Sequence, residues 1–333
     1  MSDLNINNIT DRTGDSGPVI AGVSTVSSTG AFTVPVGPTE MRGGRGRAVV
    51  VLGATPSVVT TMDYFETATT GNAIDFGDAR TARYQNGHGG MASGTRGVFQ
   101  GGASPSINIV EYVTISSSGG ANDFGDHHRG ITNGNGQCAN GTRGLLAGGY
   151  VAPVSTNLID FITIATTGST SDYGEIDDGS TGGYSPMTSP TRAVFARAGQ
   201  GINYINYTSG GKTQIFGDMR GDSRSGHVAS CSNSTRGIMA GGEAPSRVNT
   251  ITYITIATLG NGIDFGDLVA VRNDQDAVAS QIRGFVVAGS TGSTTNLIDF
   301  VTIASTGNAS DFGDLTQART QPLAFSDVHG GLG

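Results

Sequence analysis

The sequence has no tryptophan, only two cysteines, and a single lysine, Lys212. Charged residues make up 14% of the chain, about half the usual share of roughly 25%. The lack of tryptophan argues against a sugar-binding surface without excluding one, because sugars stack on aromatic faces and nine tyrosines remain. A shortage of charged helix formers, with no apolar run at 3.6-residue spacing, excludes a protein built on long amphipathic helices.

The charge balance and the cysteines exclude further classes. A formal net charge of −8 argues against a nucleic-acid binder, because phosphates require a basic face. We expect no secretory signal and no membrane insertion, since no basic and apolar leader and no run of about 18 apolar residues is found. Cys138 and Cys231 occupy equivalent positions in non-adjacent repeats, so we expect no disulfide between them.

Glycine, by contrast, is abundant, with 54 residues among many Thr, Ser, Ile, Val and Asn. This composition is typical of short strands joined by tight turns. A strand such as 159–164 is apolar on both faces, as expected for a sheet covered on both sides. The fold is therefore predicted to be all-β.

Two motifs recur along the chain. Arg-Gly followed by two apolar residues begins at Arg96, Arg143, Arg236 and Arg283, and weaker copies with Ala in place of Gly begin at Arg47 and Arg192. Asp-Phe-Gly-Asp occurs intact at 75–78, 123–126, 264–267 and 311–314, with variants at 172–175 and 215–218. A spacing of 44 to 49 residues accommodates four short strands. We predict a six-bladed kelch-like β-propeller over residues 47–333, behind a short extended N-terminal arm, residues 1–46.

The last repeat predicts how the ring closes. An inner strand precedes each Arg-Gly strand, for example roughly 83–93, but none precedes Arg47. A spare strand is present at 319–327, so we expect the C-terminus to complete the first blade.

Repetition also argues against chemistry at the motifs. Asp-Phe-Gly is a kinase motif, but here it recurs by blade, so we expect Phe to fill the space between blades and Asp to cap turn amides. The repeated arginines would either pair with repeated aspartates, which we favour, or line a channel. Met91, Cys138, Met187, Cys231 and Val278, each five residues before an arginine, are predicted to be a buried column.

We predict no catalytic residue, no cofactor and no metal site. His127 and His128 are sequence neighbours that would point to opposite faces of a strand. His88 and His227 fall in predicted inner strands, where a structural histidine is expected. A calcium site at the repeated acids is not favoured, because no Asp-x-Asp-x-Asp-Gly loop is present.

Two regions are candidates for contact with partners. The repeat from Arg192 to about 235 is the shortest and departs most from the pattern, through drift or because it faces a partner; its candidate contacts are Tyr204, Tyr207 and Arg197. The arm has too few apolar residues for its own core. Its candidate assembly residues are Phe32, Val34, Val36, Arg42 and Arg45.

The phrase Asn-x-Ile-x-Tyr/Phe-Val/Ile-Thr-Ile-Ala, followed by Gly-Asn, Asp-Phe-Gly-Asp-Leu and Ala-Arg, resembles the kelch-like repeats in virion structural proteins of tailed phages infecting cyanobacteria. The resemblance covers roughly residues 41–333, and the lead-in 34–47 is similar to that group too. It implies a non-enzymatic tail, fibre, neck or baseplate component, assembled in the host cytoplasm and located in the virion.

The expected partners are other virion proteins held through the arm and further copies of the chain, with no nucleic acid. An alternative is a receptor-binding adhesin for a host surface glycan or protein. A propeller enzyme would require a cluster of acids or histidines that breaks the repeat.

Overall fold

The structure is a computed structural model of the 333-residue chain. It describes residues 46–84, 87–103, 107–129, 134–151, 153–177, 183–197, 201–219, 228–243 and 245–332, and the backbone of three short N-terminal strands. The chain forms two compact units, Met1–Pro38 and Thr39–Gly333.

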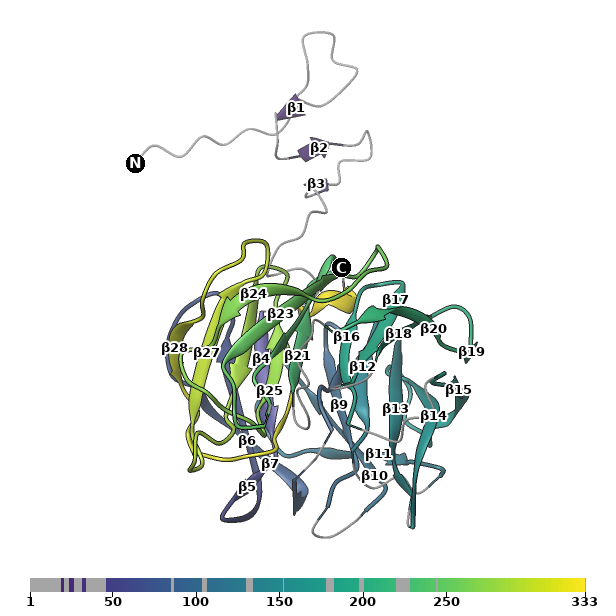
Figure 1. The fold of residues 1–333 in the computed structure, drawn as a ribbon. Coiled ribbons are helices and arrows are strands. Elements are labelled where there is room, and N and C mark those ends of the chain that lie inside the picture. Colours follow the sequence, from purple (N-terminus) through teal and green to yellow (C-terminus); the bar gives the residue numbers. More distant parts are fainter. Residues whose placement is uncertain are drawn as a thin grey trace, which may run out of the picture. The chain divides into compact units, whose positions relative to one another are not determined.

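The second unit is a six-bladed β-propeller, as predicted. Apart from one short parallel pair given below, its sheets are antiparallel, and in blades 2 to 6 the four main strands follow one another in sequence across the sheet (Figure 1). Blades 2 and 3 comprise β8 (Met91–Ala92), β9 (Arg96–Gln100), β10 (Ile109–Thr114), β11 (Asn122–Asp126), and β12 (Gly136–Ala139), β13 (Arg143–Val151), β14 (Val154–Thr163), β15 (Ser171–Glu175). Blade 4 comprises β16 (Ser185–Thr188), β17 (Arg192–Ala196), β18 (Gly201–Asn206) and β20 (Gln214–Asp218). Its β19 (Gly211–Lys212) pairs in parallel with β15 of blade 3.

Blades 5 and 6 have the same order. They comprise β21 (Ala229–Ser232), β22 (Arg236–Ala240), β23 (Thr250–Thr255), β24 (Ile263–Asp267), and β25 (Asp276–Ala279), β26 (Arg283–Val287), β27 (Leu297–Thr302), β28 (Ser310–Asp314). Blade 1 comprises β29 (Leu323–Ser326), β4 (Arg47–Val51), β6 (Ser57–Glu66) and β7 (Ile74–Arg83), with β5 (Ala54–Thr55) against β6.

Blade 1 confirms the predicted ring closure. Strand β29, from the C-terminus, pairs antiparallel with β4, with Leu323 opposite Val51 and Ser326 opposite Ala48. The inner strand expected at 83–93 is shorter than predicted, since only Met91–Ala92 forms β8. Arg83 is instead the last residue of β7, because its buried side chain is held by an ion pair described below.

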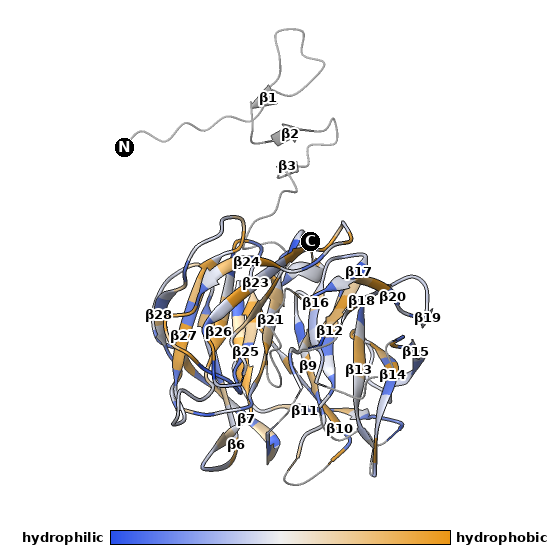
Figure 2. Cartoon of the chain, in the orientation of Figure 1, coloured by the Kyte–Doolittle hydropathy of each residue, from blue (hydrophilic) through white to orange (hydrophobic). Residues whose placement is uncertain are grey.

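The hydrophobic core lies between the blades. Both faces of each inner strand are covered, and apolar residues recur along the strands (Figure 2). Phe325 of blade 1, for example, packs in one cluster with Phe99 of blade 2, with the two rings stacked at 6.1 Å. Stacking of successive sheets explains why the sequence shows no alternation of apolar and polar residues.

The first unit contains a small antiparallel sheet of β1 (Val19–Ile20), β2 (Ser24–Val26) and β3 (Phe32–Thr33). The candidate assembly residue Phe32 therefore begins a strand, opposite Val26. The other four candidates, Val34, Val36, Arg42 and Arg45, lie outside the described residues, as does His227.

Candidate functional site

The repeated arginine is the main link between blades. In each blade its Nη1 donates to a backbone carbonyl just after the third strand of the next blade, at 2.6 to 3.1 Å. The six pairs are Arg47–Ile115, Arg96–Ile164, Arg143–Tyr207, Arg192–Ile256, Arg236–Ile303 and Arg283–Thr67. The last pair joins blade 6 to blade 1, so the contact runs around the whole ring.

Each of these guanidinium groups also lies over an aromatic ring of its own blade. The rings are Tyr64, Tyr112, Phe161, Tyr204, Tyr253 and Phe300, at 4.1 to 5.3 Å from the guanidinium carbon. Both interpretations offered from the sequence are therefore wrong for this set: the arginines neither pair with repeated aspartates nor line the channel. Among the described residues, an ion pair is found for Arg47, with Glu66.

The Asp-Phe-Gly-Asp motif forms a second link between blades. Its aromatic residue is buried in every blade, as predicted. The carbonyl of Phe76 accepts from the amide of Gly119 in the next blade, at 2.7 Å. Gly77 has φ +136°, and a Cβ there would lie 2.4 Å from the Gly119 oxygen. Only glycine permits so close an approach.

The motif's aspartates do not cap turn amides as expected. Their carboxylates face outward, in an exposed position on either side of the buried aromatic in β11, for example. The capping runs the other way, because the backbone amide of Asp314 donates to the side-chain Oδ1 of Asn72 in the next blade, at 3.1 Å.

The predicted core column is confirmed, since Met91, Cys138, Met187, Cys231 and Val278 are all at most 6% exposed. Each side chain faces the residue after the arginine of the next blade. A Cβ at Gly237 would lie 2.4 Å from the Met187 sulfur. Ala193 occupies that position beside the smaller Cys138. The two Ala variants of the Arg-Gly motif are thus matched to smaller neighbours.

Burial raises the pKa of both cysteine thiols to about 12. Cys138 and Cys231 are therefore protonated and inert near neutral pH, and both are free of a disulfide.

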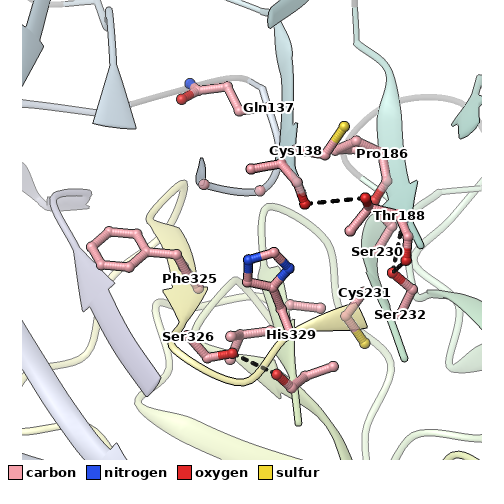
Figure 3. A pocket seen from close by; sticks show the side chains of 17 residues that line it. Gln137, Cys138, Pro186, Thr188, Ser230, Cys231, Ser232, Phe325, Ser326 and His329 are labelled. Carbon is pink, nitrogen blue, oxygen red and sulfur yellow. Dashed lines mark hydrogen bonds between the residues drawn. The ribbon is translucent and has the colours of Figure 1, made fainter. Parts of the chain in front are cut away.

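A small cavity lies near the centre of the ring. Inner strands of all six blades surround a cavity of about 40 Å³ (Figure 3). Since a water needs roughly 10–15 Å³ measured in this way, the cavity has room for a few waters. In the cavity wall, serine hydroxyls bond the inner strands of neighbouring blades to each other. Ser230 donates to the carbonyl of Pro186 at 2.7 Å, and Ser326 donates to that of Ala279 at 2.6 Å.

One end of the channel is closed by the C-terminal plug, residues 327–332, which includes the short 3-10 helix η1 (Gly330–Leu332). The plug touches the other blades in turn. His329 Nε2 bonds the carbonyl of Ala92, and Gln281 Nε2 donates to the carbonyl of His329, both at 2.8 Å. A Cβ on Gly331 would meet the carbonyl oxygen of Ala139 at 1.9 Å. The plug is thus fitted closely to this ring.

A second set of arginines, which the sequence interpretation missed, forms buried ion pairs across blade boundaries. These pairs are Arg83–Glu111 at 2.6 Å, Arg272–Asp299 at 2.7 Å and Arg319–Asp63 at 3.0 Å. Each arginine lies five residues after the last Asp of the repeated motif. The signal was an acid in the middle of an apolar strand, as in Ile298-Asp299-Phe300.

A fourth acid, Asp160, occupies the position in β14 that Glu111, Asp299 and Asp63 occupy in the third strands of their blades, but it has different neighbours. His127 Nε2 lies 3.2 Å from Asp160 Oδ2, His128 Nε2 lies 3.8 Å from Oδ1, and Arg129 Nε lies 2.9 Å from Oδ1. The expectation that the two histidines point to opposite faces is wrong, because β11 ends at Asp126; their rings are stacked, 5° from parallel. Burial, with nearby His128 and Arg129, lowers the pKa of His127 to about 3, so its ring is neutral at pH 7.

Of the candidate partner contacts in blade 4, Tyr207 is ruled out. Its side chain is 4% exposed, and its hydroxyl pairs with that of Thr188 at 2.8 Å. Tyr207 takes the place of the isoleucine after the third strand in four other blades, which the sequence did not suggest. Tyr204 and Arg197 are half-buried.

The exposed apolar residues of blade 4 are elsewhere. Ile215, in place of a motif Asp, is 72% exposed, and Leu259 on the adjoining turn of blade 5 is 59% exposed. The amide of Gly260, beside Leu259, donates to the carbonyl of Phe216, which brings the two segments together.

No protein-family model matches the chain, and no curated protein sequence matches it. Within the part of the chain that the structure describes, no helix is long and apolar enough to span a membrane.

Proposed function

We propose that this chain is a non-enzymatic structural protein of a tailed-phage virion, in which the N-terminal arm anchors a rigid propeller to other virion proteins and to further copies of itself. The observation that carries the proposal is the repetition of the same arginine-to-carbonyl contact at all six blade boundaries, which joins the blades into one closed ring. Such a ring is suited to bearing load and presenting a surface, in line with the family that the repeats resemble.

The path of the chain supports a role for the arm in attachment. The arm leads into the propeller at Arg47, whose backbone amide donates to the carboxylate of Asp327 at 2.8 Å. Entry is therefore on the face closed by the C-terminal plug. The hairpin that carries β5 lies at the opposite face (Figure 1), which would leave that face free to project outward.

Two measurements test this proposal. Mass spectrometry of gradient-purified particles should detect the chain at a fixed copy number, and its presence in lysates alone would contradict a virion role. Light scattering should show that residues 1–333 assemble while residues 39–333 remain monomeric. If both chains have the same number of protomers in solution, the arm is not the element that drives assembly.

The second candidate, a receptor-binding adhesin, is favoured by the exposed pair Ile215 and Leu259 at the rim between blades 4 and 5. All five other blades have an aspartate at the position of Ile215. An adhesin should lose binding to host cells when Ile215→Asp and Leu259→Thr restore the ordinary repeat. Unchanged binding, or none by the parent protein, would count against this candidate.

A further inference from the structure

The boundary between blades 2 and 3 breaks the repeat in a way that suggests a ligand. The residue after the repeated motif is a buried aliphatic in the other five blades: Ala79, Ile176, Met219, Leu268 and Leu315. In blade 2 it is His127, which is fully buried. An imidazole is costly in a place where an aliphatic side chain suffices, so a polar partner must be gained in return.

Neutralising Asp160 does not account for both histidines. At three other boundaries, one arginine suffices for the equivalent acid, and Arg129 supplies that guanidinium to Asp160 here. His127 and His128 are additional. Under strict geometry the Nε2 of His127 has no hydrogen-bond partner, although it is buried and aimed at the carboxylate.

We propose that His127, His128 and Asp160 form a binding site for a divalent transition metal of the zinc class. Their ligand atoms all lie within 4.8 Å of one another. Nitrogen and oxygen ligands about 2.0–2.1 Å from a tetrahedral ion are roughly 3.4 Å apart. Asp160 Oδ2 lies 3.2 Å from His127 Nε2, and Asp160 Oδ1 lies 3.8 Å from His128 Nε2, so each imidazole is close to that separation from one carboxylate oxygen.

The surroundings match those of a structural site. Two imidazoles and a carboxylate suit zinc, cobalt and nickel better than calcium or magnesium. Arg129 would orient the Asp160 carboxylate through its hydrogen bond without binding the ion itself. The Thr170 hydroxyl, 2.8 Å from His128 Nδ1, would orient the His128 ring. The ion would fasten the segment after β11 to β14, and thus blade 2 to blade 3.

The test uses the full chain after removal of metals with a chelator. Calorimetric titration with zinc should show one ion per chain, and cobalt should give the visible absorption of a low-coordinate nitrogen and oxygen site. His127→Leu, which restores the residue of blades 5 and 6, and His128→Ala should each weaken zinc binding at least tenfold.

The matched control is His88→Gln, since His88 also lies near a buried carboxylate, Asp276 at 3.8 Å, but among the described residues no metal-ligating cluster of three groups includes it. Its zinc affinity should stay within twofold of the parent. Absence of zinc binding by the parent overturns the proposal. So does binding that survives both His127→Leu and His128→Ala, because His128 is 35% exposed and can be replaced without disturbing the core.

Discussion

At each blade boundary, one arginine stacks on an aromatic ring of its own blade and donates to a carbonyl of the next. The planar guanidinium can do both, whereas an ammonium group cannot present a flat face and directed donors together. Both contacts depend on the tertiary fold, since Arg236 and Ile303 are 67 residues apart.

We predict that Arg236→Ala lowers the free energy of unfolding by about 1.5–3 kcal/mol, the range for a hydrogen bond from a charged group. Urea denaturation measures the change. Arg80→Ala is the control, because Arg80 is 49% exposed in its ion pair with Asp123 and should contribute no more than about 0.5 kcal/mol. Equal losses in the two variants would contradict an inter-blade role for Arg236.

Each side chain of the core column packs against the residue after the arginine of the next blade, and exchanging one such pair for another tests this fit. Gly237→Ala should destabilise the protein by about 1–3 kcal/mol, because the new methyl group overlaps Met187. Combining it with Met187→Cys reproduces the Cys138–Ala193 pair of the neighbouring boundary. The double variant should recover most of the loss in chemical denaturation. No recovery would mean that the backbone, and not the Met187 side chain, limits the space.

At the scale of elements, the C-terminal plug depends on a neutral histidine. His329 Nε2 donates to the carbonyl of Ala92, and Nδ1 accepts from the amide of Gly331 at 3.1 Å. Protonation of Nδ1 would remove the second bond. Burial lowers the pKa of His329 from 6.5 to about 4.

The folded pKa of His329 lies below the unfolded value, so its contribution to stability is full above about pH 6.5 and declines as the pH falls towards 4. Within that window, each pH unit costs up to about 1.4 kcal/mol from this group. Unfolding experiments from pH 7.5 to 4 should therefore show a shallower decline for His329→Gln than for the parent. Identical slopes would show that His329 does not titrate with folding.

The outer strand of each blade also bonds to the next blade. Each Asp-Phe-Gly-Asp strand bonds to a turn of the next blade as well as to its own sheet, as between Gly307 and Phe265 at 2.8 Å. Edges that would otherwise invite aggregation are partly covered by the neighbouring blade.

At the scale of the whole molecule, stability depends on closing the ring. Strand β29 completes blade 1, and Arg319, in the segment that leads from blade 6 to β29, forms a buried pair with Asp63 of blade 1. Without them, blade 1 would expose the edge of β4 and leave a buried acid unpaired, which is costly.

A chain ending at Ala318 should therefore melt at least about 10 °C lower than the full chain, since 1 kcal/mol corresponds to roughly 2–4 °C in a domain of this size or somewhat smaller. Differential scanning calorimetry measures the change. A chain ending at Val328, which keeps β29 and loses most of the plug, should fall between the two. An unchanged melting temperature in the shorter chain would disprove closure by the C-terminus as a source of stability.

The sequence by itself determined the all-β class, the six blades, the closing strand and the buried column that includes Cys138 and Cys231. These features repeat at a fixed spacing or follow from apolar residues on both faces of a strand, so they can be inferred from order along the chain.

Only the tertiary structure decided which groups meet across the blade boundaries. It assigned the repeated arginines to carbonyls and aromatic rings, buried Tyr207, and brought His127 and His128 to Asp160. The arginine–carbonyl bonds and the contacts of His127 and His128 with Asp160 join residues of neighbouring blades, and Arg283 with Thr67 joins positions 216 residues apart. Such contacts are fixed by the radial stacking of sheets. The repeat shows which positions recur, but packing in three dimensions sets the register between blades and so decides which partner each position meets.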